Sequence, residues 1–489
     1  MQRSEQTTWD RVRETFQQVW GYEDFRPPQG EIVRTLLTGQ DALIVLPTGA
    51  GKSICFQLPA LMRGGLTLVV SPLVALMENQ VQELRQRNLP AASLHGELSP
   101  YQRRQTLAAI DKQRLRLLYL SPETLLSPAV WERLCQAHIR INGLILDEAH
   151  CLVQWGETFR PAYRRLGAVR PALLQHKPPG TQIAIAAFTA TADPQAQQEI
   201  ERTLQLHQPS LFRFSPYRPN LFLSVQMSWT PRGRRQRLRQ FIKARAGQSG
   251  LVYVRTRRDS DRLAEWLRQA GHKTTAYHAG LSPDQRRAVE AAWINNTLEF
   301  VVCTSAFGMG INKPDVRWVI HFHAPALLSE YVQEVGRGGR DGKPAEALTL
   351  VSEPTGWLDP EDRQRSQFFL DQMQSQRRTA QQLAKSLPPH GEIRAVEQQF
   401  KDGAIALSLL HSQGRLEWTD PFHYILHPQT GAPGASKPAA SKGNVTRPMT
   451  RYLYGQTCRW QSLLESFGFG QAGAPMRCGH CDRCTPKAT

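Results

Sequence analysis

The feature that most constrains the fold is a series of short, fully apolar runs, each followed by a polar motif. In the first part of the chain these runs occupy residues 42–45, 66–70, 115–120, 144–146 and 183–188. Runs without polar alternation are typical of strands buried on both faces, and the amphipathic stretches between them predict covering helices. Ligands of such parallel sheets bind beyond the carboxyl ends of the strands, where every polar motif falls here.

A second series follows after a polar, proline-containing junction near residues 205–220. Its apolar runs occupy residues 251–254, 274–277, 300–302 and 318–322. We therefore expect an α/β protein with two parallel-sheet domains in tandem, one over residues 1–208 and one over 209–355.

The first run leads into residues 46–53, Leu-Pro-Thr-Gly-Ala-Gly-Lys-Ser. A strand, a glycine loop and a helix form a phosphate cradle, in which loop N–H groups and the helix N-terminus face the phosphates. Lys52 would supply a cation and Ser53 would bind Mg²⁺, with Thr48, Gly49 and Gly51 in the loop. A chance Gly-Lys-Ser turn is the alternative, and the second domain has no such loop.

Asp147 and Glu148 end the fourth run. A nucleotide hydrolase needs one carboxylate in the Mg²⁺ shell and another that orients the attacking water, and these two residues suit the roles in that order. A pair of solvated loop acids is the alternative.

A glycine-rich turn at residues 333–342 carries Gln333, Arg337 and Arg340. Because the transition state of phosphoryl transfer spreads negative charge over the γ-phosphate, a cation opposite the phosphate loop is expected, and either arginine could provide it.

The net charge of +18 and the pI of about 9.9 favour a polyanionic partner, most simply nucleic acid. A genome bias towards arginine explains part of the composition but does not remove the charge. A basic run, in which Arg232, Arg234, Arg235, Arg237 and Arg239 recur, fits the solvated face of a helix better than a DNA contact.

No apolar run reaches the ~20 residues of a membrane span, and the N-terminus lacks an apolar signal core. We expect a soluble, cytoplasmic protein, associated with the nucleoid if the source is bacterial.

Taken together, the motifs resemble those of the RecQ family of DNA helicases in superfamily 2. They follow one another in the order and spacing of that family at residues 25–29, 71–77, 119–123, 147–150, 189–192 and 306–316. The resemblance implies RecA-like domains, ATP and Mg²⁺ as cofactors, and Arg340 as the arginine finger with Arg337 beside the γ-phosphate. It also implies that Tyr22 stacks on adenine while Arg26 and Gln29 bond its edge.

Residues 154–161 resemble the aromatic-rich loop with which the family senses single-stranded DNA. Trp155 and Phe159 can stack on bases without reading sequence, and Arg160 can meet a phosphate. The alternative is that the two aromatic residues pack in the core. It is disfavoured because the segment has few apolar neighbours and because Gly156 and Pro161 would break a helix.

Four cysteines crowd the end of the chain, Cys458, Cys478, Cys481 and Cys484. Four thiolates on a short irregular segment suit tetrahedral Zn²⁺, with an iron–sulfur cluster as the rival, and the family resemblance favours zinc. His480 is left out because four cysteines complete a site. The other cysteines, at positions 55, 135, 151 and 303, fit buried free thiols.

After residue 355 the pattern changes to a mostly helical region. Residues 356–428 fit the second half of a winged helix and a helical hairpin equally well, residues 429–448 read as a flexible linker, and residues 449–489 form the zinc-binding module. The chain ends five residues after Cys484, whereas long RecQ proteins continue into a winged helix and often an HRDC domain.

Three positions depart from the usual motifs. Leu46 replaces a small residue, Ala50 replaces a glycine of the family's phosphate loop, and Gly338, where alanine is usual, is expected to loosen the arginine-bearing turn.

The expected function is that of an ATP-dependent 3′–5′ DNA helicase in repair and recombination, acting on single strands and on duplexes with a single-stranded tail. Two alternatives stay open: a DNA-stimulated ATPase that translocates but unwinds poorly, and a DNA-structure-binding protein that uses ATP as a switch.

Overall fold

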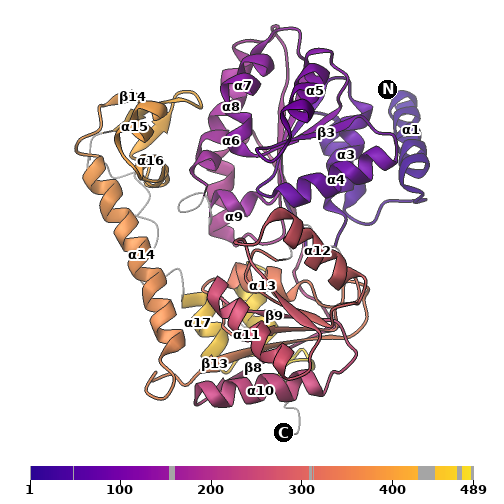
Figure 1. The fold of residues 1–489 in the computed structure, drawn as a ribbon. Helices are drawn as coiled ribbons and strands as arrows, with labels where there is room; N and C mark the ends of the chain where they lie inside the picture. Colours follow the sequence, from indigo (N-terminus) through magenta and orange to yellow (C-terminus); the bar gives the residue numbers. More distant parts are fainter. Residues whose placement is uncertain are drawn as a thin grey trace. The chain divides into compact units, whose positions relative to one another are not determined.

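The computed structural model describes residues 2–47, 49–153, 160–307, 311, 313–427, 447–470 and 476–485, with the backbone alone over residues 2–8. The chain divides into two compact units (Figure 1). Unit 1 comprises Met1–Phe214 and Gln374–Pro438, and unit 2 comprises Ser215–Met373 and Ala439–Thr489, so the chain passes between the units three times.

The described part of unit 1 contains a seven-stranded parallel sheet in the order β3-β4-β2-β5-β6-β1-β7. Its strands are β1 (Ala42–Val45), β2 (Leu66–Val70), β3 (Ala91–Leu94), β4 (Leu117–Leu120), β5 (Ile141–Leu146), β6 (Ala184–Thr189) and β7 (Ser210–Arg213). Its helices are α1 (Gln2–Trp20), α2 (Gln29–Leu37), α3 (Lys52–Met62), α4 (Val74–Gln86), α5 (Pro100–Asp111), α6 (Pro122–Leu125), α7 (Pro128–Cys135), α8 (Val169–Leu174) and α9 (Pro194–Thr203), with the 3₁₀ helices η1 (Ala149–Leu152) and η2 (Pro161–Ala168).

Successive residues of β1 enter different cores because side chains alternate across a strand. Leu43 and Val45 belong to one buried cluster, and Ala42 and Ile44 to another on the opposite face. Both faces of the sheet are therefore covered, as the fully apolar runs predicted.

The described part of unit 2 contains a six-stranded parallel sheet in the order β10-β11-β9-β12-β13-β8. Its strands are β8 (Leu221–Ser228), β9 (Gly250–Tyr253), β10 (Thr274–Tyr277), β11 (Phe300–Cys303), β12 (Trp318–His321) and β13 (Ala345–Ser352). Its helices are α10 (Pro231–Lys243), α11 (Arg257–Gln269), α12 (Pro283–Ile294), α13 (Leu328–Val335), α17 (Arg447–Tyr454) and α18 (Arg459–Ser466). Two α/β domains in tandem, predicted from the sequence, are thus confirmed.

The predicted basic helix is α10, and one of its arginines differs from the others. Arg234 is buried, with its guanidinium bonded to the carboxylates of Asp359 and Asp362, whereas the other four arginines of the run are exposed. The interpretation as a solvated face therefore holds for all but Arg234.

The segment after unit 2's sheet has the order of elements of a winged helix. A long helix, α14 (Glu361–Leu383), precedes β14 (His390–Glu392), α15 (Ile393–Gln399), α16 (Gly403–Ser412), β15 (Leu416–Trp418) and β16 (His423–Leu426). The three strands pair antiparallel in the order β14-β16-β15. This small sheet excludes a mere helical hairpin.

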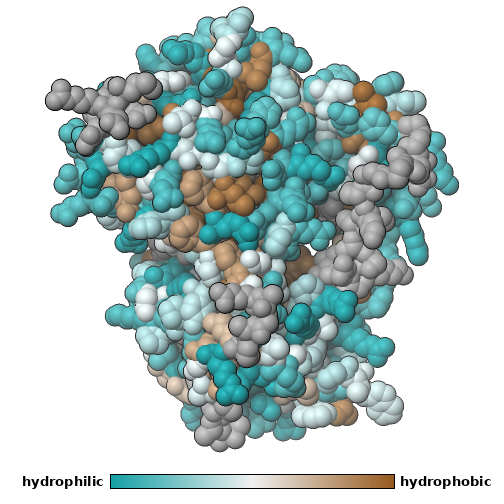
Figure 2. All heavy atoms as spheres, turned by 180° about the vertical axis from the view of Figure 1, so that it is seen from behind, coloured by the Kyte–Doolittle hydropathy of each residue, from teal (hydrophilic) through white to brown (hydrophobic). Residues whose placement is uncertain are grey.

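Hydrophilic residues cover most of the face shown in Figure 2. No helix among the described residues is both long and apolar enough to cross a membrane.

A buried ion pair joins several elements of unit 1. Asp41, just before β1, lies 2.6 Å from Arg170 of α8 and also accepts the backbone N–H groups of Ile185 and His207 at 2.8 and 2.7 Å. Both charged side chains are almost fully buried.

Replacing Asp41 by alanine should lower the free energy of unfolding by about 3–5 kcal/mol, because Arg170 and two N–H groups would stay buried without their partner. Denaturant unfolding of the full chain measures this. The control is Asp284→Ala, which removes an exposed ion pair with Arg287 and should change stability by less than about 1 kcal/mol. Equal effects of the two substitutions would contradict the assignment.

Candidate functional site: a nucleotide-binding edge and a cysteine cluster

The loop between β1 and α3 has the backbone that a phosphate cradle requires. Gly49 and Gly51 have φ angles of +86° and +73°, a region that favours glycine. Gly51 caps α3, whose first residues are Lys52 and Ser53, so the helix N-terminus opens towards the loop. Thr48, also predicted in this loop, lies outside the described residues.

Gln29 connects the predicted adenine motif with this loop. Its buried side chain donates from Nε2 to the Ala50 carbonyl at 3.0 Å and accepts from the Arg26 N–H at 3.1 Å. A side chain at Gly51 would overlap the same Nε2 atom. Tyr22 and Arg26 are exposed nearby in sequence, and both remain available to a ligand.

The acidic pair follows β5, which β6 separates from β1 in the sheet. Glu148 has a left-handed backbone with φ of +52°, which is uncommon for a residue with a side chain and recurs at functional sites. Its carboxylate lies 3.8 Å from Lys52 Nζ and 3.2 Å from His150 Nδ1. Burial, and then the neighbouring Glu148 charge, raise the pKa of the Asp147 carboxyl to about 6.

His150 extends the group to the end of β6. Its Nδ1 atom lies 3.2 Å from the hydroxyl of Thr189, which also accepts the Thr191 N–H at 3.2 Å. The phosphate loop at residues 46–53, the acidic motif at residues 147–150 and the Thr-Ala-Thr-Ala motif at residues 189–192 are therefore in contact within unit 1.

Lys52 fits a bound anion. Its buried Nζ atom has no hydrogen-bond partner within the described part of the chain. A buried ammonium in that condition is costly, and phosphate oxygens would supply the missing acceptors. Together with the Ser53 hydroxyl and the Asp147 carboxylate, hard oxygen donors that suit Mg²⁺, the residues fit a magnesium nucleotide.

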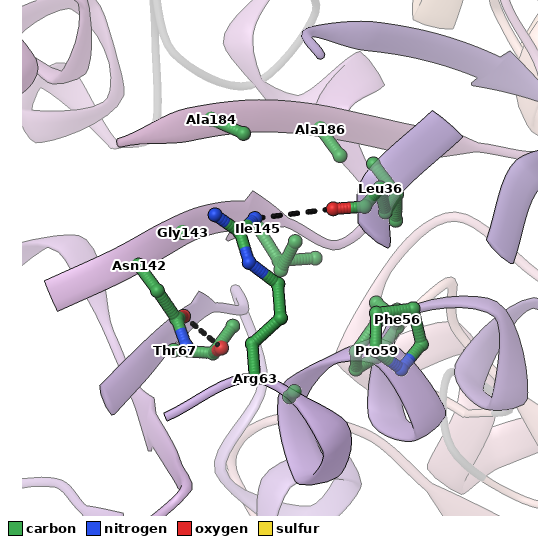
Figure 3. Close-up of a pocket in the computed structure, with 11 residues that line it drawn as sticks. Leu36, Phe56, Pro59, Arg63, Thr67, Asn142, Gly143, Ile145, Ala184 and Ala186 are labelled. Carbon is green, nitrogen blue, oxygen red and sulfur yellow. Dashed lines mark hydrogen bonds between the residues drawn. The ribbon is translucent and has the colours of Figure 1, made fainter. Parts of the chain in front are cut away.

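The small pocket in Figure 3 is a different feature. Arg63, Thr67 and Asn142 line it, and it lies at the amino ends of β2, β5 and β6, opposite the edge that carries the phosphate loop. Arg63 donates to the Leu36 carbonyl at 3.1 Å, and Thr67 to Asn142 Oδ1 at 2.7 Å. Its polar groups are thus engaged with each other.

The remaining predicted catalytic residues belong to unit 2. Gln333 is on α13, Arg337 is buried in the turn that follows, and Arg340 donates to the Ile311 carbonyl at 3.1 Å. Glu334, which adjoins Gln333, was not predicted as a site residue. Its carboxylate accepts from Arg255 at 2.9 Å and contacts His321 Nε2 at 2.8 Å.

The Glu334 network holds α13 against the sheet. Burial alone raises the pKa of the Glu334 carboxyl, but Arg255 and His321 outweigh it and hold that pKa below its usual value. The carboxylate is therefore charged, and it ties the helix that bears Gln333 to the ends of β9 and β12.

The arginine-bearing turn is closely packed, which differs from the expectation of a loosened turn. A side-chain carbon at Gly338 would lie 3.3 Å from both Ala345 and Leu221. The next residue, Gly339, has a φ of +55°, and its carbonyl accepts from Asn220 at 2.8 Å.

The predicted DNA-sensing loop is described only at its end, because Trp155 and Phe159 lie outside the described residues. Arg160, which begins η2, pairs with Glu123 at 3.3 Å. Glu123 belongs to the family motif at residues 119–123, so the end of the predicted DNA-sensing loop meets a second family motif here.

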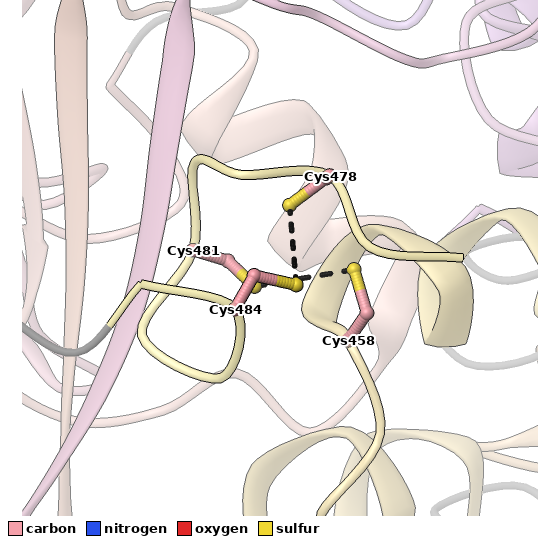
Figure 4. Close-up of side chains that lie close together, drawn as sticks. All are labelled: Cys458, Cys478, Cys481 and Cys484. Carbon is pink, nitrogen blue, oxygen red and sulfur yellow. Dashed lines mark hydrogen bonds between the residues drawn. The ribbon is translucent and has the colours of Figure 1, made fainter. Parts of the chain in front are cut away.

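The four terminal cysteines converge (Figure 4), with all their sulfur atoms within 4.8 Å of one another. The Cys478–Cys484 and Cys481–Cys458 sulfur pairs are each 3.9 Å apart. Tetrahedral thiolates about 2.3 Å from Zn²⁺ would be about 3.8 Å apart, whereas a disulfide needs about 2 Å. His480 is not part of the group, and it contacts the Cys478 carbonyl instead at 2.7 Å. Of the other cysteines, 55, 151 and 303 are buried and Cys135 is partly buried, all as free thiols.

This cysteine group is attached to the edge of unit 2's sheet. Leu223 of β8 donates to the His480 carbonyl at 3.3 Å and accepts from the Asp482 N–H at 3.0 Å. The buried Arg459 bonds the Asp482 carboxylate at 2.8 and 2.9 Å. Residues 480–482 thereby extend the sheet by a short parallel bridge at Cys481.

Two family models match the chain. Residues 26–200 match a DEAD/DEAH box helicase domain, and residues 233–342 match the helicase conserved C-terminal domain. The chain is 52% identical to an "ATP-dependent DNA helicase RecQ" of Synechocystis sp., over 97% of this chain and 98% of that protein.

The chain belongs to the RecQ family of ATP-dependent DNA helicases. It is also 40% identical to RecQ of Pasteurella multocida and 39% identical to the "Probable ATP-dependent DNA helicase RecS" of Bacillus subtilis, over 70% of this chain in each case. It spans 52% and 66% of the length of these two RecQ-family relatives. ATP-dependent DNA unwinding, with nucleotide and Mg²⁺ use, is the activity of this family.

Solved structures agree on the tandem fold of this RecQ-family chain. A Mycobacterium smegmatis helicase Lhr bound to ssDNA and AMP-PNP aligns with a TM-score of 0.56 at 21% identity, over 85% of this chain and 60% of that one. Mss116p bound to ssRNA and AMP-PNP aligns with a TM-score of 0.58 at 18% identity, over 69% and 71%.

Replacing Gly51 by alanine should weaken ATP binding at least about tenfold, because the new side chain requires a strained φ and collides with Gln29. Titration with a fluorescent ATP analogue measures the loss. Gly64→Ala is the control, since its added carbon meets no atom within 4 Å and should leave ATP affinity unchanged. Normal affinity in the Gly51 variant would contradict a phosphate cradle at this loop.

Proposed function

We propose that this chain couples ATP hydrolysis to 3′–5′ translocation along single-stranded DNA and to unwinding of tailed duplexes in DNA repair and recombination. The observation that carries the proposal is the contact of Glu148 with both Lys52 and His150 beyond the carboxyl ends of β5 and β1, the two strands that flank β6. A DNA-binding protein with ATP as a passive ligand has no need of a carboxylate in that place.

The roles in unit 1 follow from this arrangement. Lys52 binds the phosphates, and Ser53 and Asp147 hold Mg²⁺, which neutralises phosphate charge when bound. Phosphates at Lys52 compete with Glu148 for the same ammonium, so nucleotide binding leaves the Glu148 carboxylate to orient a water molecule. Tyr22, Arg26 and Gln29 recognise adenine.

Gln333, Arg337 and Arg340 complete the site from unit 2. Arg340 acts as the arginine finger, with Arg337 beside the γ-phosphate, so that both arginines stabilise the charge of the transition state. In unit 1, Trp155 and Phe159 stack on bases while Arg160 meets the backbone. We also propose that the protein associates with the nucleoid if its source is bacterial.

A translocase with weak unwinding is the second candidate, and one observation favours it. In a winged helix that reads DNA, the second helix of the pair enters the groove. Here that helix is α16, whose residues 406–410 are all buried, and it packs against η2 of the same unit. The β15–β16 hairpin is docked as well, because Phe422 contacts Trp131 and Pro421 accepts a bond from Arg165.

The test is unwinding of duplexes with a 3′ tail, a 5′ tail or no tail, with ATP hydrolysis followed in the same sample. We expect unwinding of the 3′-tailed duplex alone and hydrolysis stimulated by single-stranded DNA. Lys52→Ala should lower hydrolysis by at least about 100-fold because phosphate binding loses its cation, while DNA affinity stays within about twofold.

Each other outcome has a distinct meaning. Stimulated hydrolysis without strand separation would select the translocase, and preference for a 5′ tail would refute the direction. Unchanged hydrolysis in the Lys52 variant would refute the site.

We further propose that the cysteine group holds one Zn²⁺. Elemental analysis of the full chain should find about one zinc, and Cys481→Ser should lose it and lower the melting temperature, because the bridge to β8 depends on the group. Cys135→Ser, outside the group, should keep the zinc. Iron in place of zinc would identify a cluster instead and refute the proposal.

A further inference from the structure

Unit 2 presents an aromatic corner that the proposed mechanism does not use. Trp357, in the loop between β13 and α14, is 90% exposed, and Trp229, directly after β8, is 60% exposed. Phe368 on α14 is 70% exposed. Large aromatic side chains in water gain from a partner that covers them, so their accumulation marks an interaction site.

Trp229 and the loop that carries Trp357 leave the sheet at neighbouring strands. Strands β8 and β13 pair in parallel, with Ser228 opposite Ser352, so Trp229 and the loop that starts at Glu353 emerge together at the carboxyl edge. Ligands of parallel sheets bind at this edge.

The loop holds Trp357 outward by its own bonds. The buried Glu353 carboxylate accepts the N–H groups of Thr355 and Leu358 at 2.7 and 3.1 Å, and Gly356 takes a φ of +66° between them. A collapsed loop could cover the indole against the sheet, whereas this bonded turn keeps the indole in solvent. Because the loop is already ordered, a partner that binds there loses little affinity to the entropy of ordering it.

Arg234 anchors the other end of the same loop. It lies 3.1 Å from Asp359, which is fully buried, and bonds Ser352 Oγ at 2.6 Å and Asp362 at 2.8 Å. Since Arg234 belongs to the first half of α10, which follows Trp229, the helix and the loop form one corner.

The corner is positively charged at its surface. The acids Glu353, Asp359 and Asp362 are bonded within it, and Glu361 pairs with Arg365 at 3.1 Å. Exposed arginines follow the tryptophans closely in the chain, at positions 232, 235 and 363, of which Arg363 donates to the Thr355 carbonyl at 3.2 Å and Arg235 lies over the Trp266 ring. A partner that carries flat aromatic rings and evenly spaced negative charges matches this surface.

We propose that Trp357 and Trp229 form a base-stacking platform for single-stranded DNA on unit 2, in addition to the loop at residues 154–161 of unit 1. Stacking on indoles tolerates every base, and arginines beside them follow the phosphates. The inference rests on the proposed translocation along DNA and adds a second contact to it, on the other unit of the motor. An acidic protein tail is the other occupant, and the test separates the two.

The experiment measures binding of a fluorescent oligothymidylate to the full chain by anisotropy. Trp357→Ala should weaken binding about tenfold, and the double variant with Trp229→Ala further, whereas Trp357→Phe should retain most of the affinity. ATP hydrolysis without DNA should stay unchanged in all three. The matched control is Tyr101→Ala, which removes an aromatic residue 64% exposed on α5 of unit 1 and should not change binding.

A second readout does not depend on affinity. An oligonucleotide with 5-iododeoxyuridine should crosslink under light to a peptide containing Trp357. Wild-type binding in the Trp357→Ala and double variants, or crosslinks confined to unit 1, would overturn the platform and leave the corner to a protein partner. If the unsubstituted chain itself shows no DNA-stimulated hydrolysis, the proposed function fails first, and the two failures are thereby distinguished.

Discussion

The Glu148 carboxylate, held between Lys52 and His150, is the interaction on which the site in unit 1 depends. These three residues follow strands β1 and β5, and His150 reaches Thr189 at the end of β6. Because β5, β6 and β1 are adjacent in the sheet, their carboxyl ends bring together segments that are more than 90 residues apart in the chain. The order of the strands thus determines which motifs can cooperate.

Buried strands were predictable because a strand that is covered on both faces has no side open to polar residues, so its sequence is a continuous apolar run. The runs at residues 42–45 and 66–70 coincide with β1 and β2. Two edge strands, β7 and β8, were missed for the same physical reason, whereas the edge strand β10 coincides with the predicted run at residues 274–277. The edge strand β7 alternates between partly buried and exposed residues, and β8, at the edge of the other sheet, mixes buried and partly exposed ones, so neither forms an apolar run.

The site residues were predictable as types and spacings, but their contacts were not. Nothing in a local pattern shows that Gln29 donates to Ala50, or that α16 covers η2, since both contacts depend on how distant elements pack. The same holds for Arg234, which reads as one member of a basic run. Its burial follows from two carboxylates more than 120 residues away that neutralise it.

The edge strand β8 links the features that distinguish unit 2. Its outer side would present unpaired N–H and C=O groups, which native sheets usually cover. Here the backbone at residues 480–482 pairs with Leu223, so the cysteine group protects that edge. The same strand leads directly into Trp229. A metal bound by the four cysteines would therefore also stabilise the strand that leads to the aromatic corner. The cysteine group contacts unit 2's sheet through backbone pairing.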